Sequence, residues 1–407
     1  MRANKTLLLV VTVVTALTVG SCAQPTAEPM VEPTQSPAEP TAEPTQVPAE
    51  PSGEPIKIGQ ITPLTGGAAL DGQHVSNGAQ LAVDEINATG GVLGRPIELI
   101  VEDGKADPTE SINAAEKLLT RDEVNVLLGC WASSATLAVI PVVEEYEIPF
   151  VVEISTNSSI TQQGVPWVFR TSSNEALNSQ FLGGTAVNKL GFSKIAYLAV
   201  NNDWGRGAAE NYTNIIEQEG GEVVLTEFSD ASEVNFYAIL NRVAASGADG
   251  MVVTHSLSTM SNIFRQMREI ELDIPVLLTG GYTLEAMGEA AGGDLSIYDG
   301  VYALGYTVPA AIGVMDNVTA FVENYQAAYP EDPISRGSAN GYDAIYVIAE
   351  AIRIAGNTEP AAIRDALEQV SYEGVGGLIE FDDQNQAHPL LFLTQVQGEE
   401  QVIVEFD

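Results

Sequence analysis

The chain is poor in cysteine, histidine and basic residues, and each scarcity excludes a class of function. Its 407 residues include 2 Cys and 3 His, too few for a disulfide scaffold or, on their own, for a four-ligand zinc or iron–sulfur site. Lys and Arg number 17 against 55 Asp and Glu, so the formal net charge is −38. A surface this acidic repels phosphate backbones and anionic headgroups. We therefore expect no metal site and no nucleic-acid partner.

The common catalytic motifs are also missing. The sequence has no G-x-S-x-G, H-E-x-x-H, G-x-G-x-x-G or G-x-x-x-x-G-K-[ST] pattern. Its histidines, His74, His255 and His388, lie far apart. We predict that the chain is not an enzyme and uses no cofactor. The alternative is a hydrolase whose triad is dispersed among Ser133, His255 and an acid.

The N-terminal segment has the pattern of an export signal. Two basic residues precede the apolar run 7–17, which is too short for a comfortable membrane span. The run is followed by Val19-Gly20-Ser21-Cys22, which resembles the lipobox of bacterial lipoproteins. We expect residues 1–22 to be a lipoprotein signal peptide and Cys22 to carry a lipid anchor on the outer face of the cell membrane. The alternative is an ordinary signal peptide, with Cys22 incidental.

Residues 23–55 repeat Pro-Thr-Ala-Glu-Pro and Pro-Ala-Glu-Pro without a basic residue. Proline at this density prevents helix and sheet, and the like charges of the glutamates keep the chain extended. In polyproline form, roughly 33 residues reach on the order of 100 Å. We predict a semi-rigid linker between the anchor and a folded body.

The body alternates short apolar strands with amphipathic helices. Hydrophobic residues make up 45% of the chain and charged ones 18%, enough apolar material for more than one core. The alternation begins at Ile56 and starts again near Lys194, which predicts an α/β fold of two Rossmann-like lobes, each a mostly parallel sheet flanked by helices. We assign residues 56–172 plus 308–378 to lobe 1 and 173–307 plus 379–407 to lobe 2. Ligands of such sheets bind at the carboxyl ends of the strands, so the cleft between the lobes is the expected site.

Two neighbouring strand ends are rich in hydroxyl groups. The first, residues 129–136, contains Trp131 and Ser133 and runs from a predicted strand into a predicted helix; the second contains Ile154, Ser155 and Thr156. Hydroxyls and free N–H groups at a helix N-terminus suit a carboxylate or another oxygen-rich group. The alternative is that the serines only cap helices.

The order of several short motifs resembles the leucine/isoleucine/valine-binding type of periplasmic binding protein. The motifs cover residues 56–407 and are the following: Ile56-Lys57-Ile58-Gly59, Pro63-Leu64-Thr65-Gly66, Gly90-Gly91-Val92-Leu93-Gly94-Arg95, Ser133-Ser134-Ala135-Thr136, Phe169-Arg170-Thr171, Asp203-Trp204-Gly205-Arg206-Gly207 and Gly341-Tyr342-Asp343-Ala344. The resemblance implies a type I periplasmic-binding fold with a three-segment hinge. It also implies a monomer that captures a branched-chain or related amino acid and delivers it to the permease subunits of an ABC importer.

Family roles transfer to four positions of this sequence. The resemblance places the ligand's carboxylate on Ser133, its carboxylate and amine near Thr156, and a backbone contact at Ile154. It places Trp204 as the aromatic residue that closes over the ligand from lobe 2. Tyr282 is a further candidate, either stacking on the ligand or covering the lobe.

Two departures from the family pattern concern charge. Asp71 stands where an aromatic residue often lines the pocket, and its alternative role is a turn residue before Gly72. No carboxylate from lobe 2 stands where the family pairs the ligand's ammonium, so Asp71, Glu153 or Asp203 would have to supply it. If none does, the ligand is an amide, a urea or an aromatic or aliphatic carboxylate. A sensor module for a membrane receptor is the alternative to transport. The family's disulfide is absent, since Ala106 and Ala132 stand at its approximate positions.

Overall fold

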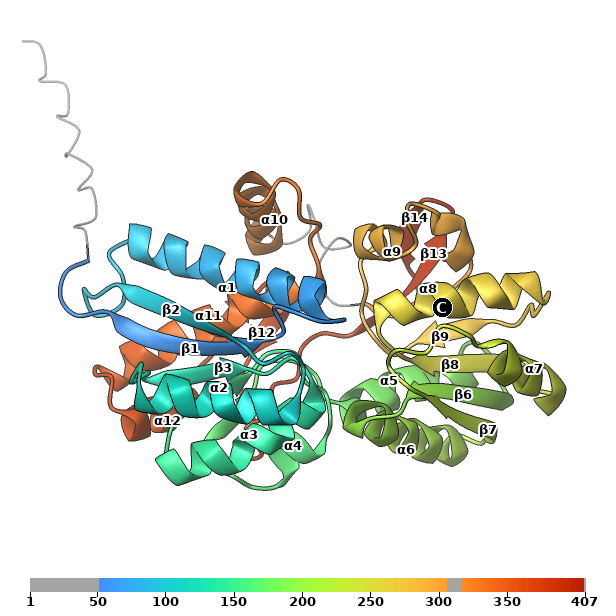
Figure 1. Cartoon of the computed structure of the whole chain (residues 1–407), viewed down its shortest axis with the longest axis horizontal. Coiled ribbons are helices and arrows are strands. Elements are labelled where there is room, and N and C mark those ends of the chain that lie inside the picture. Colours follow the sequence, from blue (N-terminus) through green and yellow to red (C-terminus); the bar gives the residue numbers. More distant parts are fainter. Residues whose placement is uncertain (1–50, 306–315, 406–407) are drawn as a thin grey trace, which may run out of the picture. The chain divides into compact units, whose positions relative to one another are not determined.

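The structure is a computed structural model that describes residues 51–305 and 316–405, which belong to one compact unit. The predicted signal peptide, Cys22 and nearly all of the predicted linker lie outside the described residues. Figure 1 shows the described chain as two sheets, each with helices on both faces.

The first sheet contains only parallel strands, in the order β2-β1-β3-β4-β5. Its strands are β1 (Ile56–Thr62), β2 (Ile97–Asp103), β3 (Val126–Gly129), β4 (Phe150–Val152) and β5 (Val168–Arg170). The helices that follow β1 to β4 are α1 (Ala69–Ala88), α2 (Pro108–Thr120), α3 (Ser133–Tyr146) and the short α4 (Ser159–Gln162). This sheet and its helices form lobe 1.

Alternating strand residues fill two separate cores in lobe 1. Ile58, Val126 and Leu128 pack against α1 and α11, whereas Leu127 and Phe150 face α2 and α3. Successive side chains of a strand point to opposite faces, so a strand that is apolar throughout is buried on both. The same rule explains why the sequence shows these strands as continuous apolar runs.

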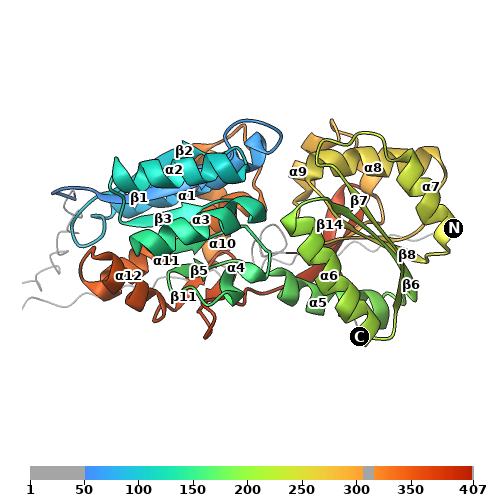
Figure 2. The same ribbon diagram turned by 60° about the horizontal axis from the view of Figure 1, so that its bottom comes forward.

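The second sheet forms lobe 2 and has the order β14-β13-β10-β9-β8-β6-β7. Its strands are β6 (Lys194–Val200), β7 (Glu222–Ser229), β8 (Gly250–Thr254), β9 (Val276–Leu278), β10 (Tyr302–Gly305), β13 (Phe392–Gln397) and β14 (Glu400–Ile403). The pairs β10–β13 and β13–β14 are antiparallel, and the other pairs of this sheet are parallel. The helices are α5 (Glu175–Asn188), α6 (Asp203–Gln218), α7 (Tyr237–Ser246), α8 (Leu257–Glu269) and α9 (Leu284–Ala290), with a 3-10 helix at Leu295–Tyr298. Figure 2 shows α5 and α6 on one face of this sheet and α7, α8 and α9 on the other.

The chain crosses between the lobes three times, which confirms the predicted hinge of three segments. It passes from β5 to α5, from β10 to α10, and from β12 to β13. The second passage returns the chain to lobe 1, where α11 packs along α1. The lobe 1 elements of this return are α10 (Asp316–Ala328), α11 (Arg336–Ala355), α12 (Pro360–Leu367), β11 (Tyr372–Gly374) and β12 (Gly377–Ile379). The lobe boundaries given above stay predictions.

The structure differs from the sequence-based elements mainly at the hinge and the pocket. The fourth strand ends at Val152, so Glu153 and Ile154 follow it rather than belong to it. The strands β5 and β10 and the helix α5 were not predicted from the apolar pattern. Within the described ranges, no helix is long and apolar enough to cross a bilayer.

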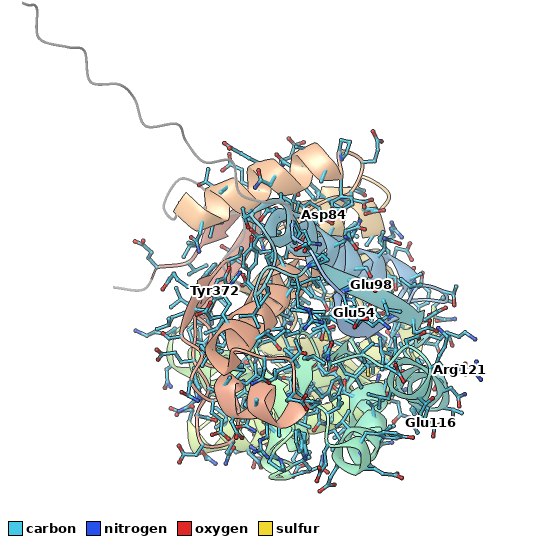
Figure 3. The ribbon with its side chains drawn as sticks, turned by 90° about the vertical axis from the view of Figure 1, so that its left-hand side faces the viewer. Glu54, Asp84, Glu98, Glu116, Arg121 and Tyr372 are labelled. Carbon is cyan, nitrogen blue, oxygen red and sulfur yellow. The ribbon has the colours of Figure 1, made fainter. Side chains whose placement is uncertain are left out.

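The acidic residues are distributed over the outside of the fold. Glu54, Asp84, Glu98 and Glu116 are exposed, and Figure 3 labels them together with Arg121 on one face. The formal charge of −38 is therefore carried in part by solvated carboxylates. Salt bridges among the described residues are few and mostly lie at partly exposed positions, so they stabilise the fold little.

Candidate functional site

A pocket lies at the carboxyl ends of the strands of both sheets. It encloses about 890 Å³ of space, part of it open to solvent, which is within the usual size of small-molecule sites. Lobe 1 contributes Asp71, Trp131, Ala132, Ser133, Ile154, Ser155, Thr156, Ser335, Arg336 and Gly337 to its lining. Lobe 2 contributes Asn202, Trp204, Ser256, Leu257, Gly280, Gly281, Tyr282, Thr283 and Ala286.

All eight predicted ligand-binding positions line this pocket. They are Asp71, Trp131, Ser133, Ile154, Ser155, Thr156, Trp204 and Tyr282. The strand-end rule explains the result, because β1, β3, β4, β6, β8 and β9 all open toward the pocket through their following loops. The role of each residue in binding a ligand stays a prediction.

Many helices begin at the pocket. Residues of the cap or first turn of α1, α3, α6, α8, α9 and α11 are among its lining. Asn202 caps α6, Thr283 caps α9 and Ser335 caps α11 through their side chains. Because the N-terminal end of a helix carries partial positive charge, the pocket favours an anionic group of a ligand.

Ser133 is the first residue of α3 and has a hydroxyl proton to donate. Its Oγ accepts a hydrogen bond from the backbone N–H of Asn157 at 3.3 Å, and no described residue accepts the proton of this hydroxyl. The side chain is 4% exposed and lines the pocket. A carboxylate needs donors, and Ser133 offers one beside the positive end of a helix.

Thr156 differs from Ser133, because its hydroxyl already donates a hydrogen bond to another residue. The hydroxyl donates to Glu175 Oε1 at 2.6 Å, and the indole N–H of Trp204 donates to the same oxygen at 2.7 Å. Glu175 is buried behind both residues at the start of α5, where burial raises the pKa of its carboxyl above the ordinary value; these two bonds and the charges of Arg336 and Arg170 oppose that rise. Two donors on one oxygen suit the ionised carboxylate, so Thr156 turns its lone pairs toward the pocket.

Ser155 and Trp131 hold the first hydroxyl-rich turn in place. Ser155 Oγ lies 2.6 Å from Thr136 Oγ1 and donates to the backbone oxygen of Trp131 at 3.0 Å. The Trp131 backbone has a φ of 65°, an unusual value for a residue other than glycine. The Ser155 hydroxyl is therefore engaged within the wall of the pocket, and Trp131 is placed by it.

Strand order gives the pocket two distinct ends. In lobe 1 the lining follows β1, β3 and β4, which are consecutive in the sheet, so Asp71 and Thr156 lie two strands apart, about 10 Å. In lobe 2, Tyr282 and Thr283 follow β9 and Trp204 follows β6. The bond from Thr156 and that from Trp204 to Glu175 join the lobes at one end, and Thr283 Oγ1 donates to the backbone oxygen of Ile334 at 2.8 Å at the other.

Charged side chains mark both ends. Asp71 lies in the first turn of α1, where burial and the charge of Glu289 on α9 raise the pKa of its carboxyl to about 6. Arg336, the first residue of α11, lowers the pKa of Glu175 by its positive charge and acts on Arg170 as well. Sequence reasoning missed both Arg336 and Glu175, because neither follows a predicted strand of the first lobe.

Three other expectations are corrected by burial and contacts. Glu153 is neither solvated nor part of the pocket: its side chain is 0% exposed, and burial raises its pKa to about 8. Asp203 is exposed and is not among the lining residues. His255 Nε2 lies 3.0 Å from Ser229 Oγ, so its ring pairs with Ser229 in lobe 2 rather than with Ser133.

The contacts of Tyr282 and the burial of Cys130 explain the positions of these two residues. The Tyr282 hydroxyl donates to the backbone oxygen of His255 at 2.8 Å, which holds the ring against Gly280 at the pocket wall. Cys130 is buried and has a free thiol, as expected for a small core residue. Among the described residues, no group of three or more His, Cys, Asp or Glu is placed to hold a metal ion.

Comparison with known proteins gives the same family over nearly the whole described chain. The family model described as periplasmic binding protein matches residues 55–401. A leucine-, isoleucine-, valine-, threonine- and alanine-binding protein of Pseudomonas aeruginosa is 26% identical over 328 residues, which cover 81% of this chain and 86% of that protein.

Solved structures agree in fold. A leucine-binding protein from Thermotoga maritima superposes with a TM-score of 0.78 at 26% identity, covering 86% of this chain and 98% of that one. A solute-binding protein of an ABC transporter from Rhodopseudomonas palustris, in complex with 3,4-dihydroxybenzoic acid, gives a TM-score of 0.76 at 26% identity, covering 86% and 96%. The chain belongs to the periplasmic binding protein family, and it is a solute-binding protein of the ABC-transporter type.

Proposed function

We propose that this chain captures a branched-chain or related amino acid in the pocket between its lobes and delivers it to the permease of an ABC importer. Ser133 donates to the carboxylate beside the N-terminus of α3. Thr156 and the backbone oxygen of Ile154 accept from the amine, and Trp204 covers the ligand from lobe 2. The relatives named for amino acids support this assignment.

One observation carries the proposal: the two hydroxyls at neighbouring strand ends have opposite polarity. The Ser133 hydroxyl is free to donate a hydrogen bond to a ligand, whereas the Thr156 hydroxyl already donates to Glu175 and can only accept one from a ligand. An amino acid matches this pair, because its α-carboxylate needs a hydrogen-bond donor and the neighbouring α-ammonium needs an acceptor. The mainly helix-terminal lining adds to the preference for the carboxylate.

Calorimetric titration of the full chain with amino acids and with matched 2-hydroxy acids tests the proposal. We expect saturable binding of at least one amino acid and weaker binding of its hydroxy counterpart, with a rise in melting temperature because ligand binds only the folded state. A Ser133→Ala variant should lose about tenfold or more in affinity for both, since both carry the carboxylate. Absence of binding across the panel at millimolar concentration would contradict the proposal.

Two alternatives remain worth testing in the same panel. The relative seen with 3,4-dihydroxybenzoic acid favours aromatic carboxylates as a second class, and Trp131, Trp204 and Tyr282 supply aromatic surface in the pocket. Such a ligand would bind without an amine, as would small amides and ureas. The second alternative is that the protein is a sensor module for a membrane receptor and binds its ligand in the same pocket. Copurification with permease subunits would indicate transport, and copurification with a receptor would indicate sensing.

We further propose that the protein works as a monomer tethered to the membrane by a lipid on Cys22, at the outer face of the cell membrane. The short basic and apolar segment before Cys22 and the Pro/Glu-rich residues 23–55 support this placement.

A further inference from the structure

Asp71 is a carboxylate of the pocket lining that has no partner among the residues the structure describes. It lies in the first turn of α1 and is partly buried. No described residue donates a hydrogen bond to its side chain or forms an ion pair with it. Its backbone is fixed, because the neighbouring Gly72 packs so closely on the backbone oxygen of Pro63 that a Cβ there would come within 1.8 Å of it. The Cα of Asp71 is therefore held at the pocket.

Asp71 stands at the end of the pocket that the proposed amino-acid head group does not reach. Ser133 follows β3 and Thr156 follows β4, whereas Asp71 follows β1 on the far side of β3. A ligand held by its carboxylate at Ser133 and its amine at Thr156 thus directs its remaining atoms toward Asp71. An aliphatic end placed there would cover an ionised carboxylate and strip it of water, which is unfavourable.

The charges near Asp71 do not neutralise it. Glu289 on α9 adds a second negative charge, and it raises the pKa of Asp71. His74 lies on the next turn of α1, and burial lowers the pKa of its ring, so at neutral pH it stays uncharged; both ring nitrogens are buried without a partner among the described residues. Asp332 is a further negative charge on this side, and it acts on His74. Arg336 begins α11 near Asp71, since a Cβ on the following Gly337 would lie 3.5 Å from the Asp71 backbone oxygen, but its positive charge acts on Glu175 and Arg170.

We propose that Asp71 selects ligands that carry a cationic nitrogen at the end remote from their carboxylate, with Glu289 as a second, outer carboxylate for that nitrogen. The inference rests on the proposed function and narrows its ligand class to basic amino acids. Because Asp71 belongs to lobe 1 and Glu289 to lobe 2, a bound cation relieves the repulsion between two carboxylates that closure of the lobes brings together.

Titration calorimetry of the full chain with matched pairs of ligands tests the inference. One series contains 2,4-diaminobutyrate, ornithine, lysine and arginine, whose charged ends sample increasing distances; the other contains norleucine and citrulline, uncharged counterparts of lysine and arginine. We expect at least one basic amino acid to bind about tenfold or more tightly than its uncharged counterpart. Leucine completes the panel.

Variants assign the selectivity to Asp71. Asp71→Asn should remove the preference: it should lower the affinity for the basic ligand about tenfold or more, whereas the affinity for norleucine should stay the same or rise, because an uncharged side chain costs less to cover. Glu289→Gln should lower the affinity for the basic ligand by a smaller factor, since this carboxylate is exposed. Glu285→Gln is the matched control, because Glu285 is an exposed acid of the same helix and Glu289, not Glu285, is the charge that acts on Asp71.

The outcomes separate this inference from the proposed function. Norleucine or leucine bound as tightly as every basic amino acid overturns the inference and leaves the proposed function in place. An unchanged preference in the Asp71→Asn variant also overturns it. If no amino acid in the panel binds, the proposed function fails first. Melting curves of each variant show that the folded state is intact.

Discussion

Glu175, a buried carboxylate one layer behind the pocket, determines what Thr156 can offer a ligand. One of its oxygens, Oε1, accepts hydrogen bonds from the Thr156 hydroxyl and from the indole N–H of Trp204. The pocket therefore presents a lone pair of Thr156 that is backed by the carboxylate of Glu175, an acid of lobe 2 that does not itself line the pocket. Under the proposed function, Glu175 is the carboxylate for the ligand's ammonium, and it acts through Thr156; the sequence did not reveal it.

Replacing Glu175 with glutamine keeps an acceptor for both donors but removes the charge. We expect Glu175→Gln to weaken binding of an amino acid about tenfold and to leave its 2-hydroxy analogue within about twofold, because only the amino acid carries the ammonium. Titration of both ligands with both proteins measures the ratio. Glu210→Gln, an exposed acid of α6, is the control, and an equal loss for both ligands would show that Glu175 is only structural.

Glu153 makes stability depend on pH. Its side chain is 0% exposed and makes no hydrogen bond of good geometry with a described group, although the backbone N–H groups of Glu153 and Gly129 lie near enough to oppose the shift. Burial raises its pKa from the ordinary 4.5 to about 8. Between these values the folded state holds a proton that the unfolded state has lost. Stability from this group is therefore complete below the unfolded pKa and disappears as the pH rises through 8.

Glutamine at position 153 has no carboxyl group, so this proton uptake is lost. We expect Glu153→Gln to be more stable than the parent at pH 8.5, by about 1–3 kcal/mol, and nearly equal to it at pH 4.5. Urea unfolding at a series of pH values gives both curves, and their difference isolates Glu153 from the other titrating groups. Parallel curves at all pH values would contradict the assignment.

At the scale of elements, the hairpin β11–β12 is fastened to α11 by one buried aspartate. Asp343 accepts hydrogen bonds from the backbone N–H groups of Val375 and Gly376, each at 2.8 Å. A Cβ on Gly374 would lie 2.7 Å from the Asp343 carboxyl carbon, whereas one on Gly376 would lie 3.4 Å from its nearest oxygen. The last passage of the chain to lobe 2 starts from this hairpin.

These distances predict that alanine is tolerated at Gly376 but not at Gly374. Gly374→Ala should cost about 1–3 kcal/mol of unfolding free energy, because the methyl group displaces Asp343 from its two donors. Gly376→Ala should cost less than about 1 kcal/mol, since it makes an ordinary contact. Urea unfolding of the two variants compares them directly, and equal losses would mean that the hairpin moves aside without effect.

Arg170 ties the strand end of the pocket to two hinge segments. Its guanidinium is fully buried, donating to Gln386 Oε1 at 2.6 Å and to the backbone oxygens of Ser155 and Asn157 at 2.9 and 2.8 Å. Arg170→Met should lose about 3 kcal/mol or more, because these carbonyls would be left buried without a donor. Arg353→Met on the surface of α11 is the control, with a loss below about 1 kcal/mol expected. Comparable unfolding midpoints for the two variants would contradict the role of Arg170.

The parts of the fold and site that the sequence predicted share one property: they depend on local pattern. Continuous apolar runs identified most strands, and the strand-end rule brought Ser133, Thr156 and Trp204 to one pocket. Contacts between distant segments were not predictable. The burial of Glu153 depends on α11, where Asn340 donates to its backbone oxygen at 2.8 Å, almost two hundred residues along the chain.

The missed elements have the same cause. The stretch from Thr171 to Glu175 is polar and reads as a loop, yet its side chains are buried at the first passage between the lobes. Gln386, from the third passage, donates to the backbone oxygen of Ser172 at 2.7 Å and thereby supports this stretch. Polar residues are buried here because they satisfy one another, and no hydrophobic period marks them.

At the scale of the whole molecule, charge and tether act together. A protein with a net charge of −38 is repelled by an anionic membrane surface, so electrostatics alone would not keep it near a permease. The acidic residues of the predicted linker, residues 23–55, add to that repulsion. The proposed lipid on Cys22 would supply the attraction, since each buried methylene contributes about 0.8 kcal/mol and more than one acyl chain gives stable anchoring.

Cys22→Ala therefore separates location from binding. We expect the variant to leave the membrane fraction and to lose labelling by a radioactive fatty acid, because no thiol remains to accept the lipid. Its ligand affinity and melting temperature should equal those of the parent, since the pocket begins at Asp71 and the body is joined to Cys22 only through the Pro/Glu-rich linker. Ser21→Thr is the control for a change beside the thiol that keeps it. Retention of the Cys22→Ala protein in washed membranes would mean that the apolar run 7–17 stays attached and anchors the chain by itself.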